Sequence, residues 1–213
     1  MTSDTQPNRI YMDHAATTPP DPRVIDLMLP FLKQYWHNPS SIYVEAQQTH
    51  KAIEDARDTV ALNIGARPEE IVFTSGGSES DTLALRGVVR ASEEQGKHII
   101  TTTVEHHAVL DTVEQLERED AEVTILGVDR VARIAPNAVA EAVRDDTVLV
   151  SVIHANNEVG TINDITEIAR VVHERNPRTV VHTDAVQSAA HLGVNVESLG
   201  VDLLSIAGHK MYG

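Results

Sequence analysis

Cysteine is absent from all 213 residues of the sequence. This absence excludes disulfide bridges and thiolate metal ligands within the chain, and it agrees with a reducing compartment. Long apolar runs are missing too: none approaches the roughly 18 residues that span a bilayer, and the first ten residues, MTSDTQPNRI, are polar. We therefore expect a cytoplasmic protein with no membrane partner.

Basic residues are far fewer than acidic residues. The chain has 17 Lys and Arg against 32 Asp and Glu, which gives a formal net charge of −15. A basic face for nucleic acid or anionic lipid is not expected from this balance. Acidic runs such as LEREDAE (residues 116–122) are typical of solvated helix faces and helix ends.

The hydrophobic pattern predicts two leading helices, over residues 19–36 and 40–65, with Gly65 ending the second. Six short apolar runs then alternate with amphipathic stretches. The predicted strands cover residues 69–74, 97–103, 122–128, 147–153, 179–185 and 201–208. The predicted helices between them cover residues 79–92, 107–120, 136–145 and 165–175, and a polar connection precedes the last strand.

The predicted strands are of the kind that helices cover on both faces. Runs such as VLVSVI (148–153) and TVVHT (179–183) are continuously apolar or β-branched, which is typical of parallel sheets. We predict an α/β fold, a doubly wound and mostly parallel sheet, over residues 19–213 after an N-terminal segment of residues 1–18. Ligands of such sheets bind at the carboxyl ends of the strands, so the residues that follow each run are candidates for a site.

The segment TSGGSESD (74–81) follows a predicted strand and opens a helix. Gly76 and Gly77 allow a ligand close to the backbone, and Ser78 adds a hydroxyl to the N–H groups of a helix start, which attract an anion. The segment is neither a Walker A loop nor GxGxxG, so a phosphate outside those nucleotide classes is indicated. The alternative is that Ser78 only caps the helix, with Asp81 completing a capping box.

Two further strand ends carry ionisable residues. Lys210 follows LLSIAG and is either a solvated turn lysine or a desolvated amine able to form a Schiff base. Asp184 follows TVVHT, 26 residues before Lys210. It is either the N-cap of the next segment or a carboxylate that keeps a pyridinium nitrogen protonated.

Histidines at several strand ends raise the question of a metal site. They are His106, His107, His154, His182 and His209. No ligand spacing such as HExxH is present, and adjacent histidines on one element diverge, so no metal is expected. An imidazole of the 106–107 pair suits stacking on a cofactor ring or moving a substrate proton. Pyridoxal phosphate requires an anion cup, a lysine, an acid, donors to O3′ and a stacking group together, and all five are available.

Seven segments, in order, resemble the cysteine desulfurases, class V pyridoxal-phosphate enzymes that supply sulfur for iron–sulfur clusters. They are YMDHAATTP (11–19), NPSS (38–41), IVFTSGGSESDTLALRG (71–87), HIITTTVEHHAVL (98–110), HANNEVGTI (154–162), HTDAVQSA (182–189) and GHKMYG (208–213). The resemblance implies the large domain of the fold type I transferases, without the small C-terminal domain. It also implies L-cysteine as substrate, a sulfur-acceptor or scaffold protein as partner, and a homodimer.

The resemblance implies a role for each matching position. Lys210 would bind pyridoxal 5′-phosphate as a Schiff base and later move a proton, and Asp184 would pair with the pyridine nitrogen. His106 would stack on the ring and act as acid or base.

The remaining implied roles concern binding. Gln187 would donate a hydrogen bond to O3′, and Asn157 would lie by O3′ and the substrate carboxylate. Gly77 and Ser78 would hold the phosphate, and His209 would add a donor.

Four positions depart from the family pattern. Ala207 stands where the family usually has a hydroxyl that binds phosphate, a loss of roughly 1.5–3 kcal/mol if nothing replaces it. His37, Tyr43 and Ala46 depart in the loop around NPSS. The reaction class is unaffected by these four changes.

The missing cysteine matters most for the chemistry. The family attacks the substrate sulfur with a cysteine thiolate, so these 213 residues are expected to be inactive alone and to be the first half of a longer enzyme. That enzyme would convert L-cysteine to L-alanine and leave a persulfide. Two alternatives are another class V enzyme, such as a selenocysteine lyase or an aminotransferase, and a non-catalytic half chain or split subunit.

Overall fold

A parallel β-sheet forms the centre of the structure, a computed structural model that describes residues 10–92 and 94–213. Its strands lie in the order β2-β1-β3-β4-β5, and every neighbouring pair is parallel. The strands are β1 (His98–Thr102), β2 (Glu122–Leu126), β3 (Thr147–Ser151), β4 (Val180–Asp184) and β5 (Leu203–Ser205). The predicted parallel α/β fold is confirmed.

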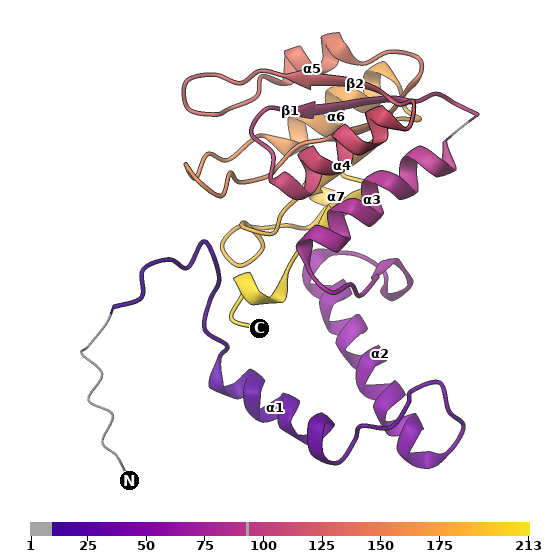
Figure 1. Ribbon diagram of the computed structural model, residues 1–213, viewed down its shortest axis with the longest axis vertical. Helices are drawn as coiled ribbons and strands as arrows, with labels where there is room; N and C mark the ends of the chain where they lie inside the picture. The colour runs from indigo at the N-terminus through magenta and orange to yellow at the C-terminus, as the bar shows by residue number, and fades with distance from the viewer. Residues whose placement is uncertain (1–9, 93) are drawn as a thin grey trace.

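Helices cover the sheet on both faces, because alternate strand residues supply two separate apolar cores. Ile99 packs with α3 (Gly77–Ala91) and α4 (His107–Arg118) on one face. Its neighbour Ile100 packs on the other face with α5 (Pro136–Ala142), α6 (Ile165–Arg175) and α7 (Val196–Leu199). Figure 1 shows these helices gathered around the strands. The sheet is therefore doubly wound, as the apolar runs predict.

The two leading helices extend away from the sheet (Figure 1). They are α1 (Pro22–Lys33) and α2 (Val44–Ile64), and both predictions are confirmed. Gly65 ends α2 in the left-handed conformation, at φ 71°. A Cβ on Gly65 would lie 2.0 Å from the Asn195 side-chain nitrogen, so glycine is required there.

One predicted strand, over residues 69–74, is wrong. Pro68–Glu70 forms a short 3-10 helix, η1, and residues 71–74 belong to no strand. A strand exists only where a neighbour pairs with its backbone, and none lies beside this segment in the described part of the chain. The apolar side chains of Val72 and Phe73 are accordingly 67% and 51% exposed.

The polar connection before the last strand contains the helix α7, which the sequence pattern does not predict. The Asn195 side chain caps its first turn by accepting from Ser198 N–H, and Gly200 ends it in the left-handed conformation. Four residues are too few to show a helical period. Residues 1–9 of the expected N-terminal segment lie outside the described residues.

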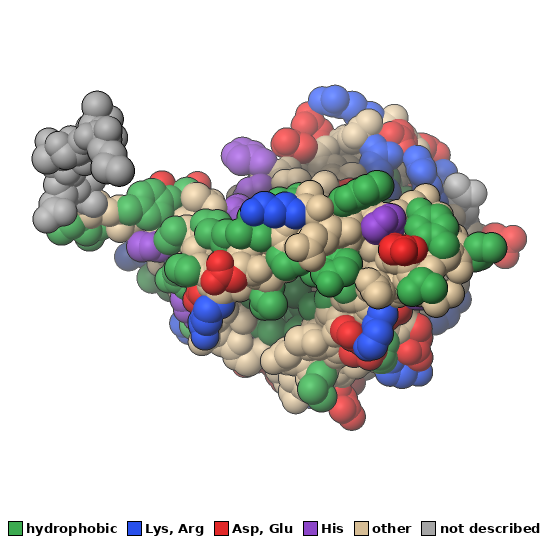
Figure 2. All heavy atoms as spheres, turned by 90° about the horizontal axis from the view of Figure 1, so that it is seen from below, with side chains coloured by type: hydrophobic (Ala, Val, Ile, Leu, Met, Phe, Trp, Pro, Cys, Tyr) green, Lys and Arg blue, Asp and Glu red, His purple; other side chains and the backbone are tan. Residues whose placement is uncertain are grey.

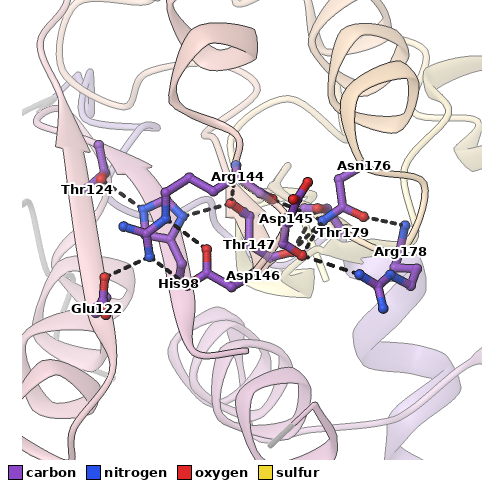
Figure 3. A network of polar contacts seen from close by, with 10 residues as sticks. All are labelled: His98, Glu122, Thr124, Arg144, Asp145, Asp146, Thr147, Asn176, Arg178 and Thr179. Carbon is purple, nitrogen blue, oxygen red and sulfur yellow. Dashed lines mark hydrogen bonds and ion pairs between the residues drawn. The ribbon is translucent and has the colours of Figure 1, made fainter. Parts of the chain in front are cut away.

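A polar network ties together the amino ends of three strands (Figure 3). His98, the first residue of β1, lies 2.7 Å from the Thr147 hydroxyl on β3 and 2.9 Å from the Thr124 hydroxyl on β2. Burial lowers the pKa of His98, so the imidazole is neutral and its two nitrogens share one donor and one acceptor role. Arg144 adds ion pairs to Glu122 and Asp146 around it. This edge of the sheet is closed by internal hydrogen bonds.

No helix in the described ranges, residues 10–92 and 94–213, is long and apolar enough to cross a membrane.

Candidate active site

A cavity of about 270 Å³ lies at the opposite edge of the sheet, where the strands end. All eight of the residues that the sequence singles out for cofactor binding or catalysis line it: Gly77, Ser78, His106, Asn157, Asp184, Gln187, His209 and Lys210. Four more residues line the cavity that the sequence does not single out for cofactor binding or catalysis: Ala16, Asp81, Ile153 and Val186. Parallel strands bring segments distant in sequence to this one place.

The start of α3 forms one wall of the cavity. Its N-cap is Gly76, which offers no side-chain cap, so the interpretation of Ser78 as a helix cap with Asp81 in a capping box is wrong. A Cβ on Gly77 would lie 2.8 Å from the Val186 side chain, so only glycine fits where α3 meets the loop after β4. The free N–H groups at this end of a 15-residue helix favour an anion.

Lys210 lies in η2 (Gly208–Lys210), the short 3-10 helix that follows β5. Its ammonium group donates to the carbonyls of Ala15 and Ala16, at 2.9 Å from the latter, so it is not a freely solvated turn lysine. The Gln187 side chain donates to the same Ala15 carbonyl over 2.8 Å. The segment around residues 15–18 therefore crosses the site.

The segment at residues 15–18 is also fastened to the residue before the lysine. The N–H and the hydroxyl of Thr18 donate to the His209 carbonyl over 2.8 and 2.9 Å. The His209 Nδ1 atom lies 3.1 Å from the Thr17 hydroxyl. These bonds join two of the recognised motifs, one from each end of the chain.

Asp184 is the last residue of β4 and is 4% exposed. One of its oxygens accepts from Val186 N–H over 2.9 Å, so Asp184 caps the turn that follows β4, as the N-cap interpretation of the next segment predicts, and it also lines the cavity. Burial raises the pKa of Asp184, and the hydrogen bond from Val186 N–H and the positive charge of Lys210 oppose that shift. The carboxylate is thus suited to face a cation in the cavity.

His106 and Asn157 occupy loop positions with defined orientations. His106 is the N-cap of α4, and its Nδ1 atom accepts from Ala108 N–H over 3.1 Å, which leaves Nε2 to carry the proton. Asn157 lines the cavity, whereas its neighbour Asn156 is buried and donates to the Val104 carbonyl over 3.0 Å. Asn156 therefore fixes the loop that presents Asn157.

The buried histidines have structural partners. His154 lies 2.9 Å from the Ser188 hydroxyl, and His182 lies 2.9 Å from Ser151 and 3.1 Å from Ser205. Burial lowers the pKa of both, that of His182 to about 4, so both are neutral. Among the described residues, no group of three metal-binding side chains comes together.

A lysine, a buried carboxylate, an imidazole and a helix N-terminus converge on one cavity at the carboxyl edge of a parallel sheet. This arrangement defines an α/β protein whose ligand carries an anionic group and a carbonyl or imine that the amine can reach. The sequence model of the aminotransferase class-V family matches residues 10–213. The chain belongs to the aminotransferase class-V family.

Known relatives agree with this membership. A cysteine desulfurase IscS of Dictyoglomus turgidum is 50% identical over 204 residues, which are 96% of this chain and 51% of the relative. One from Methanosarcina thermophila is 45% identical over 98% of this chain and 51% of the relative. The chain thus spans about half the length of the curated relatives it matches.

Solved structures resemble the chain over nearly its whole length. SspA in complex with cysteine superimposes with a TM-score of 0.92 at 40% identity, over 96% of this chain and 58% of that one. A NifS-like protein gives a TM-score of 0.94 at 38% identity, over 96% and 56%. The fold is that of the large domain of the fold type I pyridoxal-phosphate enzymes.

Family membership identifies the cofactor as pyridoxal 5′-phosphate, and the cavity fits this molecule. The cofactor has a phosphate, a basic ring nitrogen and an aldehyde. The cavity offers a helix N-terminus that starts with Gly76 and Gly77, the buried carboxylate of Asp184 and the amine of Lys210. The donor set therefore matches the cofactor group for group.

Proposed function

We propose that the protein containing this chain is a cysteine desulfurase, which converts L-cysteine to L-alanine and passes the sulfur to a protein thiol. The observation that carries the proposal is that Lys210 and Asp184 line the same cavity. Relatives named as cysteine desulfurases at 45–50% identity support this reaction over transamination.

The proposed role of the cavity residues is to hold the cofactor and to handle protons. When bound, pyridoxal phosphate supplies an electron-withdrawing ring that stabilises negative charge at the substrate carbon. Asp184 keeps the ring nitrogen protonated, because a buried carboxylate favours a cation beside it. Lys210 holds the cofactor covalently and then moves a proton on and off the substrate.

His106 and Asn157 act on the substrate side in this proposal. The Nε2 proton of His106 is available for exchange because Nδ1 is engaged with Ala108. Asn157 contributes an amide to the O3′ atom and the substrate carboxylate. Gln187 donates to O3′, and the start of α3 with Ser78 and His209 binds the phosphate.

The thiol that receives sulfur comes from outside these 213 residues, because they contain no cysteine. A sulfur acceptor or scaffold protein then takes the product onward.

We also propose that the protein is a homodimer whose partner covers the apolar side chains of α1 and α2. Figure 2 shows many hydrophobic side chains on the face that these helices form. α1 buries none of its residues, although its sequence is strongly amphipathic. Leu32, Trp36 and Leu62 are 72%, 70% and 83% exposed, more apolar surface than a lone chain ordinarily shows to water.

The test of the desulfurase proposal is a lysine substitution in the native protein. Lys210→Ala is expected to abolish alanine formation from L-cysteine and to remove the covalent attachment of the cofactor, seen as its reduction by borohydride onto the chain. Lys97→Ala, an exposed lysine paired with Asp120, is the matched control and should retain both. Near-normal alanine formation by Lys210→Ala would refute the proposal.

A further inference from the structure

Asp81 is a buried carboxyl group on the inner face of α3. It lies one helical turn before Leu85, on the side that packs against the sheet, and is 1% exposed. It also lines the cavity. Helix positions of this kind are normally apolar, and a buried carboxyl group is costly unless something at the site compensates for it.

The described residues satisfy this carboxyl group only in part, since the Ser205 side chain is the one hydrogen-bonding group that acts on it. Its Oδ1 atom has no hydrogen-bond partner in the described ranges. It lies 3.6 Å from the Nε2 atom of His182, a side chain that is 0% exposed. His182 is already bonded to the hydroxyls of Ser151 and Ser205.

Asp81 shares its buried space with Asp184. Residues His182 and Asp184 are two apart in β4, so their side chains lie on the same face of the sheet. α3 packs against that face at β3, β4 and β5. Asp81 therefore lies beside the imidazole of His182, and its carboxyl group and that of Asp184 line the same cavity.

Two buried carboxyl groups whose charges act on each other do not both ionise readily without a cation between them. Burial and the charge of Asp184 raise the pKa of Asp81 to about 7. The Val186 N–H bond and the charge of Lys210 favour ionised Asp184, and burial of His182 disfavours an imidazolium partner for Asp81. The proton therefore belongs on Asp81.

The remaining side chains of the described elements packed against α3 place no further positive charge beside Asp81. β3 and β5 present the hydroxyls of Ser151 and Ser205, and the loop after β1 presents Glu105, whose own pKa burial raises. The ion pair between Arg86 of α3 and Glu119 joins α3 to the far end of α4. The ionisable groups that face the buried space are Asp81, Glu105, His106, His182, Asp184 and Lys210.

We propose that Asp81 is a positioning residue that holds one proton against His182, so that Asp184 is the only ionised carboxylate under the cofactor ring. This inference rests on the cofactor assignment made above. With Asp81 protonated, one negative charge faces the single positive charge of the ring nitrogen. Ionisation of Asp81 places a second negative charge there and raises the affinity of the bound ring and imine nitrogens for protons.

The first test is a pH titration of the visible absorption of the bound cofactor in the native holoprotein, from pH 5.5 to 9. The wild type is expected to show an inflection near pH 7 from Asp81. Asp81→Asn, a neutral isostere of the protonated acid, should bind the cofactor and lose that inflection. Asp111→Asn, an exposed position on α4, is the matched control and should keep it.

The second test reads the protonated carboxyl groups directly and needs no active enzyme. Infrared spectroscopy of the wild type should show a protonated carboxyl band that disappears as the pH rises through about 7. Glu105→Gln removes the contribution of the other buried carboxyl group to this band. The part of the band that disappears near pH 7 should remain. Addition of Asp81→Asn should abolish it.

Two outcomes would overturn the role of Asp81. One is an unchanged absorption inflection in Asp81→Asn; the other is the absence of a carboxyl band that titrates near pH 7. A purely structural role would lower cofactor binding equally at all pH values and leave the inflection in place. Either failure leaves the Lys210 test untouched, so the inference and the desulfurase proposal fail separately.

Discussion

At the scale of single residues, one residue of a loop holds the backbone in place while its neighbour faces the cavity. Asn156 holds the loop after β3 through its own side chain, and Asn157 is thereby presented to the cavity. Asp184 binds Val186 N–H with one oxygen and faces the cavity as well. A change at such a residue alters loop geometry and chemistry together, so matched variants are needed to separate them.

Glu105 shows how a buried acid affects stability. One oxygen, Oε1, accepts from the Thr102 hydroxyl over 2.6 Å and from Ile153 N–H over 3.1 Å, while Oε2 has no partner in the described ranges. Burial raises the pKa of Glu105 to about 8, against 4.5 for the free side chain. The folded state therefore binds more protons than the unfolded state over that interval.

The raised pKa of Glu105 makes the stability of the folded state depend on pH. Stability is greatest below the unfolded pKa and falls as pH rises toward 8, by ~1.4 kcal/mol for each pH unit between the two values. Glu105→Gln removes this loss, so its free energy of unfolding relative to wild type should rise steadily from pH 5 to pH 8. Urea unfolding at several pH values measures it. The exposed Glu117→Gln should show no such trend, and a constant offset for Glu105→Gln would contradict the prediction.

At the scale of elements, α3 joins several functions. Its N-terminus faces the anion site, Asp81 lies one turn further in, and Leu85 belongs to the apolar core. The position of α3 depends on Gly77, because an idealised Cβ there meets Val186 closely and lies 3.7 Å from the Ala207 Cβ atom. Ala207, at the end of the β5 segment, is thus next to the start of α3.

The contact between Ala207 and α3 leads to a prediction about phosphate. A serine hydroxyl at position 207 would lie beside the free N–H groups of α3 and donate to the phosphate, so Ala207→Ser should tighten pyridoxal phosphate binding about tenfold, or ~1.5 kcal/mol. Fluorescence titration of the cofactor-stripped protein measures this. Pyridoxal, which lacks the phosphate, is the matched control ligand. An equal gain for both ligands would show that the hydroxyl does not reach the phosphate.

At the scale of the whole molecule, the sheet has two different edges. The amino edge is closed by the network around His98 and Arg144 (Figure 3), whereas the carboxyl edge is open and lined with ionisable groups. The α1 and α2 end presents a third kind of surface, apolar and exposed (Figure 2). Burial of that surface provides the driving force for the proposed dimer.

Trp36 reports on that apolar surface. Trp36 is 70% exposed in the isolated chain, and the proposed dimer should cover it. The native protein is expected to sediment as a dimer at micromolar concentration, with Trp36 emission shifted to shorter wavelength and protected from acrylamide. Dilution to dissociation should reverse both effects. A monomer at micromolar concentration, whether Trp36 is protected or not, would contradict the dimer.

Much of this molecule was predictable from the sequence alone, because local patterns carry the information. The amphipathic and apolar periods predict α6 to the residue and β1 to β5 within a few residues. The motif residues at strand ends meet in one cavity because parallel strands end at the same edge. The pattern left two interpretations open for Lys210 and for Asp184, and the resemblance to the cysteine desulfurases favoured the functional one.

Only the tertiary structure decided which residues have partners. Residues 71–74 have strand composition, but no strand within residues 10–92 and 94–213 pairs with them, and Asp81, expected in a capping box, is a buried carboxyl group. The sequence does carry a signal for this site, since Asp81 is a polar residue on the apolar face of α3, four positions before Leu85. Its role, however, depends on His182 and Asp184, which are more than 100 residues away in the sequence. Propensity and period are local properties, whereas pairing, burial and charge depend on what the fold places nearby.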